Sequence, residues 1–248
     1  MLNHIHQLSF YLHICAGTLA LIAFWLPIFA KKGSKNHNQY GSIFVNVMYA
    51  VSISGLLMSS IVLIDPIGIR RPGEIFDVEQ AHRIAFNHRM FASFLFMLSL
   101  LVLASVKQSV AVLRAKANRE KLKTASNLTL LFCLLVSSIV VGYVGIVNKQ
   151  TLLQVFAIIS LLNALENLHY IYKKKPLKRN QWIIHHLRLM IGAGIACYTA
   201  FIVFGGSRFI TYFFTFSNQI YLWVTPAVVG ISISLWYSKK AKQQFKVA

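Results

Sequence analysis

Charged side chains are scarce in this sequence, and acidic ones are almost absent. Charged residues make up 12% of the 248 residues, and only 6 residues are Asp or Glu. A soluble domain carries roughly 25% charged residues, so this shortage excludes an ordinary soluble domain. In their place the chain is 56% hydrophobic, and its apolar residues come in runs that are long enough to span a bilayer.

The short motifs of the common enzyme classes are also absent. The sequence has no P-loop, no dinucleotide-binding fingerprint, no Gly-X-Ser-X-Gly elbow and no His-Glu-X2-His motif. Its cysteines, Cys15, Cys133 and Cys197, lie inside apolar runs without any paired spacing. This spacing excludes a disulfide framework and a zinc knuckle, and the cysteines are expected to be small core residues. Enzyme classes with sequence-readable motifs therefore have no support.

The first nine residues contain no Lys or Arg. A secretory signal would begin with a basic region and end at a small-residue cleavage site, so the first apolar run is expected to be a retained helix. The hydropathy pattern predicts seven transmembrane helices in an all-α polytopic bundle. Their expected ranges are 10–30, 43–64, 84–106, 128–147, 152–172, 182–204 and 219–237. Asp65-Pro66 is expected to end the second helix, because proline disfavours helix in the residue before it.

Lys and Arg follow a strongly alternating distribution. Of the 25, 18 fall in the first, third and fifth connections and the C-terminal tail, and 4 fall in the other connections. This bias predicts an N-terminus outside and a C-terminus in the cytoplasm. The formal net charge of +19 is thus a topology signal and does not indicate nucleic-acid binding. Residues 111–123 are basic and helix-prone, which suits a helix on the membrane surface. We expect residues 1–248 to form one integral membrane domain.

The most informative apolar run is 182–204, which begins with His185, His186 and Arg188. Ionisable side chains inside a membrane need partners or water, so they indicate a functional site. His185 and Arg188 share one helical face with the small residues further along, Gly192, Ala196 and Thr199. Small residues allow a second helix to approach closely. We therefore expect this helix inside the bundle, with its polar side chains directed at its neighbours.

The helix expected at 152–172 carries a polar stripe at i, i+3, i+4 and i+7, formed by Asn163, Glu166, Asn167 and Tyr170, with His169 beside it. A short basic turn joins this helix to the next one, so the two are expected to be antiparallel neighbours. An ionised Glu166 would need a cation, and Arg188 is the available partner. The alternatives are a polar binding site and a purely structural ion pair.

The predicted topology sorts the histidines by membrane face. His13 and His88 would lie toward the outside, whereas His37, His169, His185 and His186 would lie toward the inside. Histidines on different helices suit axial ligation of a b-type haem. The candidate pairs are His13 with His88, and His169 with His185 or His186. The alternative for each histidine is an interhelical hydrogen bond or a position at the headgroup level.

The spacing Glu-X2-His, typical of di-iron bundles, occurs twice, at Glu79-His82 and at Glu166-His169. The two copies belong to opposite membrane faces, so they are not expected to share a metal centre.

Three motifs together resemble a known family. They are His13-X3-Gly17, then Lys32-Gly33-X3-His37-X3-Gly41, and a late His-X2-Arg helix that runs into Thr199-Ala200-Phe201. In these the chain resembles a family of bacterial polytopic membrane proteins of unknown function. The resemblance implies an integral membrane protein with recurring polar positions at His13, His37, His185 and Arg188. Either His185 or His186 could take the family's late histidine position, and the resemblance implies no reaction.

The sequence thus predicts a multi-pass protein of the inner (plasma) membrane whose partner is the lipid bilayer. The leading functional interpretation is a His-ligated cofactor or metal in the bundle, such as a b-type haem with a redox role. The alternative is a non-catalytic transporter or an assembly subunit with membrane-protein partners and a structural Glu166–Arg188 pair.

Overall fold

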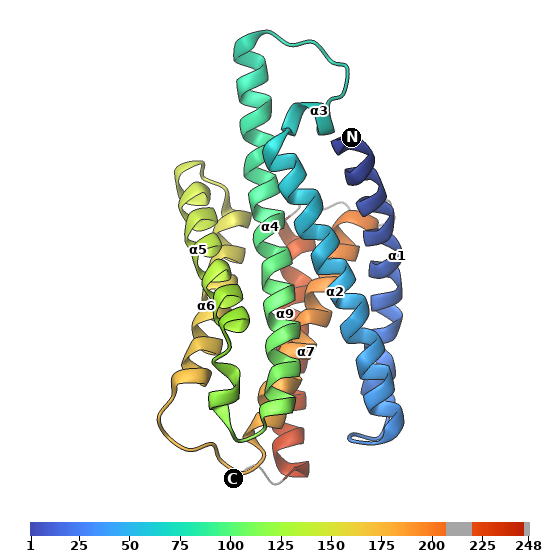
Figure 1. Cartoon of the computed structure of the whole chain (residues 1–248), viewed down its shortest axis with the longest axis vertical. Coiled ribbons are helices and arrows are strands. Elements are labelled where there is room, and N and C mark those ends of the chain that lie inside the picture. Colours follow the sequence, from blue (N-terminus) through green and yellow to red (C-terminus); the bar gives the residue numbers. More distant parts are fainter. Residues whose placement is uncertain (207–219, 246–248) are drawn as a thin grey trace.

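A computed structural model describes residues 1–206 and 220–245, and this part of the chain is an all-α bundle (Figure 1). Its elements are α1 (Leu2–Phe29), α2 (Lys35–Ile64), α3 (Pro66–Arg70), α4 (Val78–Ala115), η1 (Arg119–Leu122), α5 (Ala125–Val147), α6 (Thr151–Tyr172), α7 (Gln181–Ala200), η2 (Phe201–Gly205) and α9 (Ile220–Gln244). Within these residues, 6 segments are long and apolar enough to cross a membrane, namely α1, α2, α4, α5, α6 and α7 with η2. The predicted all-α polytopic bundle is therefore confirmed.

The seventh crossing and the orientation of the termini stay predictions. α9 occupies the place of the last expected helix and contains Pro226. The aromatic segment at its start, from residue 207 to residue 219, lies outside the described residues.

Several helices are longer than the hydropathy pattern predicted. α1 and α2 each begin eight residues earlier than expected, and α4 extends beyond both predicted ends. Hydropathy marks only the part of a helix that suits lipid, whereas the backbone can stay helical in water if its ends are capped. The side chains of Ser34 and Asp77 provide such caps for α2 and α4, since they accept hydrogen bonds from His37 N and Gln80 N.

The prediction of one surface helix over residues 111–123 is wrong. Its first residues continue α4 as far as Ala115, and only the short 3₁₀ helix η1 follows. Lys116 has a φ of 50°, a backbone conformation that cannot continue a right-handed helix. The expected break after the second helix is confirmed, since α2 ends at Ile64 and Pro66 begins α3.

α4 is the central helix of the bundle. It packs against α2, α5, α6 and α7, with the α1–α2 hairpin on one side and the α5–α6 hairpin on the other (Figure 1). Its 38 residues extend about 57 Å at the usual helical rise, well beyond a hydrocarbon core of about 30 Å. Buried residues of α4 contribute to all three apolar clusters of the core, so α4 connects the two hairpins and α7 to one another.

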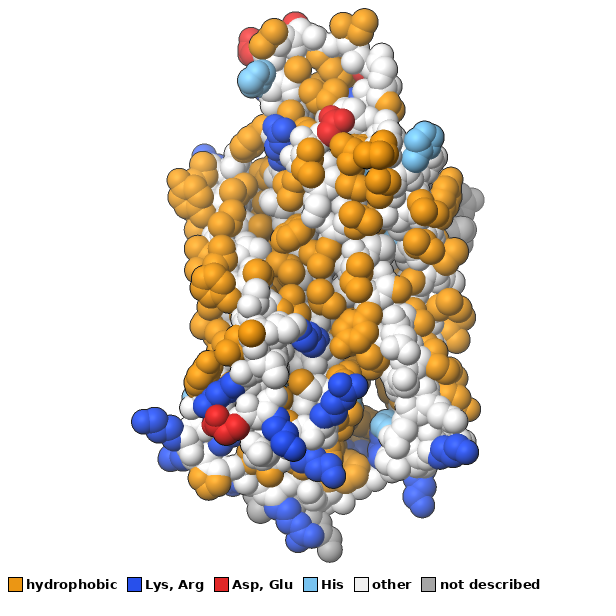
Figure 2. Space-filling model, viewed as in Figure 1, with side chains coloured by type: hydrophobic (Ala, Val, Ile, Leu, Met, Phe, Trp, Pro, Cys, Tyr) orange, Lys and Arg blue, Asp and Glu red, His pale blue; other side chains and the backbone are white. Residues whose placement is uncertain are grey.

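The two ends of the molecule differ in their content of Lys and Arg. Lys and Arg side chains gather at the end that holds the α1–α2 turn, η1 and the last turns of α9, while the middle is covered by apolar side chains (Figure 2). We refer to this end as the basic end. The positive-inside rule predicts that it faces the cytoplasm.

Candidate functional site

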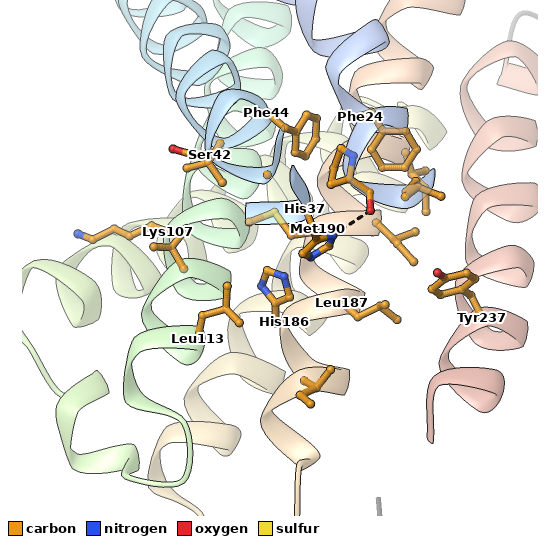
Figure 3. Close-up of a pocket in the computed structure, with 18 of the residues that line it drawn as sticks. Phe24, His37, Ser42, Phe44, Lys107, Leu113, His186, Leu187, Met190 and Tyr237 are labelled. Carbon is orange, nitrogen blue, oxygen red and sulfur yellow. Dashed lines mark hydrogen bonds between the residues drawn. The ribbon is translucent and has the colours of Figure 1, made fainter. Parts of the chain in front are cut away.

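A large cavity lies between α1, α2, α4, α7 and α9, and it extends from His37 at the basic end to Ile202 of η2. Its volume is about 1830 Å³, and we refer to it as the apolar cavity because most of its lining side chains are apolar. Figure 3 shows Phe24, Phe44, Leu113, Met190 and Tyr237 around it. A space of this size and character suits a large apolar ligand.

His37 enters this cavity from the first turn of α2. Its Nδ1 is 2.9 Å from the backbone oxygen of Pro27, one of the last-turn carbonyls of α1 that lack a helical donor. Lys32 caps the same turn, because its Nζ donates to Pro27 O at 2.7 Å and to Ile28 O at 2.8 Å. Burial lowers the pKa of Lys32. A carbonyl oxygen can only accept, so Nδ1 of His37 carries the proton in this bond.

His186 enters the cavity from α7 and is held by Ser109 of α4. Its Nδ1 is 2.7 Å from Ser109 Oγ and 3.3 Å from Ser109 O. The hydroxyl of Ser109 donates to His186 O at 3.1 Å, which leaves Oγ to accept from the imidazole. Nδ1 of His186 is therefore also the donor, as it is in His37.

The two histidines lie close together in the apolar cavity, although they come from different helices (Figure 3). Within the described part of the chain, neither Nε2 has a hydrogen-bond partner, whereas each Nδ1 is bound. With the proton on Nδ1, the Nε2 atom of the neutral ring carries a free lone pair. This is the arrangement of metal-binding histidines, whose other ring nitrogen donates to a fixed acceptor.

Cations line the same cavity. The described lining residues include five Lys and Arg and no Asp or Glu; the cations are Lys32, Lys107, Arg114, Lys116 and Lys121. A ligand that combines an apolar body with acidic groups would match this combination of surfaces.

A second cavity at the basic end, of about 480 Å³, lies between η1, α6, α7 and α9. Its ionised lining is dominated by cations, namely Arg119, Lys173, Lys178, Arg188 and Lys242, and Glu166 is its one carboxylate. His169, Tyr170, Gln181 and His185 complete its polar lining. We refer to it as the polar cavity.

Side chains bridge α6 and α7 across the polar cavity. His185 Nε2 is 3.1 Å from Asn167 Oδ1, and the His185 ring stacks on Tyr170 with 3.9 Å between centroids. The backbones of α6 and α7 make few close contacts, so these helices are not the packed neighbours that the sequence suggested. The extended connection 173–180 explains the gap, since eight residues can span about 26 Å.

The Glu166–Arg188 contact exists but is loose. Arg188 Nη1 lies 3.9 Å from Glu166 Oε1, and their side chains are 42% and 62% exposed. Because both side chains reach solvent, removing one of them would not leave the other as a buried unpaired charge. The large loss of stability that such a charge causes is therefore excluded.

The remaining predicted site residues have separate surroundings. His13 Nδ1 is 3.0 Å from Ser54 Oγ of α2, while His88 is half-buried on α4. His169 is exposed at the edge of the polar cavity. Ligation by His13 with His88 therefore stays a prediction. For His169 with His185, the structure shows Nε2 of His185 already bonded to Asn167.

One expectation about α7 needs correction. A side chain at Gly192 would meet nothing within 4 Å, whereas one at Gly194 would meet the ring of Phe24. The close approach of another helix is therefore at Gly194, on a different face from the one that the sequence suggested. The 3.6-residue period identifies faces, but it does not determine which face the neighbour occupies.

Sequence reasoning missed Ser109, Arg119 and Lys242 as site residues. Serine inside an apolar run carries no distinctive signal, and Arg119 and Lys242 belong to basic clusters that the topology rule already explains. Tyr170, in contrast, belongs to the polar stripe that the sequence already showed on α6.

The fold and these two cavities define the protein as a multi-pass α-helical membrane protein with polar residues collected at its basic end. Comparisons with family models, curated proteins and solved structures find no match for this chain.

Proposed function

We propose that this protein binds a b-type haem in the apolar cavity, with His37 and His186 as its iron ligands. One observation carries the proposal: histidines on α2 and α7 enter the same apolar cavity with Nδ1 bonded and Nε2 free. Bis-histidine ligation from two helices is a known way of holding haem iron in proteins. Bound there, the group would supply one-electron chemistry within the membrane.

The rest of the cavity supports the same ligand class. Haem has a flat apolar body with two carboxylates, and the cavity combines apolar walls with five cations and no acidic residue among its described lining. Ser109 and the carbonyl of Pro27 would orient the two imidazoles and hold the proton on Nδ1. His185 has another role, because Asn167 and Tyr170 already engage its ring.

Absorption spectra of detergent-purified protein test this assignment. The wild type should show a Soret band, or acquire one when titrated with hemin, and His37→Ala and His186→Ala should each lose most of it. His82→Ala is the matched control, because His82 is exposed on α4 and lines neither cavity. If both cavity variants keep the full haem content, the proposal fails.

The same preparation tests whether His13 and His88 bind a second haem, and it tests which class of ligand occupies the apolar cavity. A second haem that is lost in His13→Ala and His88→Ala would place a site at that end as well. A lipid or quinone recovered by mass spectrometry from wild type, but not from His37→Ala, would keep the cavity as a binding site while rejecting haem as its ligand.

A further inference from the structure

The polar cavity has a large excess of positive charge among its described lining residues. Five Lys and Arg line it, against the single carboxylate of Glu166, and that carboxylate is 3.9 Å from Arg188. An anion in this space of about 480 Å³ would be attracted by several cations at once. The composition of the lining therefore indicates an anionic ligand.

A buried hydroxyl at the same cavity also lacks a partner. Tyr170 is only 8% exposed, and its Oη has no hydrogen-bond partner among the described residues. Its ring is fixed by His185 at 3.9 Å and by the Arg119 guanidinium at 6.0 Å from its centroid. An unpaired buried hydroxyl is costly, so its presence beside a basic cavity indicates a ligand that accepts a hydrogen bond.

Arg119, which lines the cavity, is itself held by two backbone oxygens. Its Nη1 donates to Tyr170 O at 3.2 Å, and its Nη2 donates to the backbone oxygen of Lys175. These bonds tie η1 to the end of α6 and to the connection that follows it.

We propose that the polar cavity binds a phosphate group, and that this group belongs to the headgroup of an anionic phospholipid. Phosphate oxygens accept charge-assisted hydrogen bonds from Arg and Lys and an ordinary one from a tyrosine hydroxyl. The cavity lies between two candidate membrane-spanning helices at the basic end, the level at which headgroups of a cytoplasmic leaflet would lie. Leu177 and Ile184 add apolar lining that suits the glycerol and upper acyl part of a lipid.

Binding of defined lipids to the purified full-length protein tests the proposal. The probes are nanodiscs of phosphatidylcholine alone, nanodiscs with phosphatidylglycerol added, and inorganic phosphate in detergent. Melting temperature and the lipid retained after delipidation are the readouts. Phosphatidylglycerol should raise the melting temperature of the wild type and be retained, whereas phosphatidylcholine should not.

Two pairs of substitutions separate the site from general surface charge. Lys173→Gln and Lys242→Gln remove cations that line the cavity, while Lys174→Gln and Lys239→Gln remove neighbouring cations that do not. Each cavity variant should bind phosphatidylglycerol about tenfold more weakly, the usual scale for a lost charged hydrogen bond. Tyr170→Phe should weaken binding as well, while keeping the stack on His185.

The outcomes are distinct. Equal weakening in cavity and control variants would mean surface attraction only and would overturn the site, as would retention of phosphatidylcholine and phosphatidylglycerol to the same extent. Protection by inorganic phosphate, lost in the cavity variants but without added effect of phosphatidylglycerol, would keep the phosphate site and reject the lipid. None of these results depends on haem, because the variants do not touch His37 or His186.

Discussion

The imidazole of His185 on α7 lies flat on the phenol ring of Tyr170 on α6, with 3.9 Å between ring centroids and 1° between the ring planes. The stack crosses a gap between two helices whose backbones make few close contacts. Together with the bond from His185 to Asn167, it is a principal connection between α6 and α7. The position of the polar cavity therefore depends on this pair.

Replacing Tyr170 by Leu should destabilise the protein, whereas Tyr170→Phe should not. Leucine loses the stack, and an aromatic pair is worth about 0.5–1.5 kcal/mol beyond the area it buries. Phenylalanine keeps the ring and removes a buried hydroxyl that has no partner among the described residues. Thermal unfolding in detergent, without added lipid, measures both. Equal stability of wild type and Tyr170→Leu would mean that the stack does not hold the helices.

The Glu166–Arg188 contact should contribute little to stability. The pair is separated by 3.9 Å and is substantially exposed, so a double-mutant cycle of Glu166→Gln and Arg188→Gln should give a coupling below about 1 kcal/mol. The same cycle on Glu120 and Lys123, an exposed 2.8 Å pair, is a comparison outside the cavities. A coupling of several kcal/mol would show that the pair is shielded from water.

Two glycines of α7 should respond in opposite ways to the same substitution. Gly194→Ala should cost about 1–3 kcal/mol, because its methyl group would meet the ring of Phe24 and overpack that contact. Gly192→Ala has nothing within 4 Å and should be neutral or slightly stabilising, because alanine favours helix. Unfolding of the two variants in parallel checks this. Similar losses in both would argue against the packing of α1 on α7.

Ser109→Ala should weaken ligand binding in the apolar cavity without removing either histidine. Ser109 Oγ lies 2.7 Å from Nδ1 of His186, and loss of such an orienting partner typically costs 10–100-fold in metal affinity. Hemin titration measures the affinity. Ser59→Ala is the control, since in the described part of the chain the Ser59 hydroxyl bonds only to backbone oxygens of α2. An unchanged affinity would show that Ser109 does not orient the ligand.

Reporter fusions test the membrane orientation. Fusions after Lys35, Ala117, Lys175 and the C-terminus should report the cytoplasm, because these segments hold the Lys and Arg excess. A fusion near Gly73, in the connection between α3 and α4, should report the outside. The seven-helix topology is wrong if Gly73 and Lys175 report the same side.

The sequence was sufficient for the class of fold and for the approximate position of each long helix. A stretch of about 20 apolar residues crosses a bilayer in helical form because its backbone must bond internally. The break at Asp65-Pro66 was also predictable, since it follows from the local effect of proline on the residue before it. The extra turns of α1, α2 and α4 were not, because they lie outside the apolar runs and depend on caps and tertiary support.

The site was only partly predictable. The polar stripe of α6 and the polar start of α7 identified Asn167, Tyr170 and His185 as residues directed at neighbours, and the structure brings these three together. The sequence alone paired histidines by membrane face, which left several pairs open. It gave no reason to prefer His37 with His186.

Hydropathy and charge are properties of single segments, so the sequence by itself determined an all-α membrane bundle with a basic end. Contacts between segments depend on how each helix is rotated about its axis and on what it packs against, which only the tertiary structure decided. Ser109 and His186 are 77 residues apart and meet because α4 packs against α7. His37 reaches the same cavity because it bonds to the end of α1.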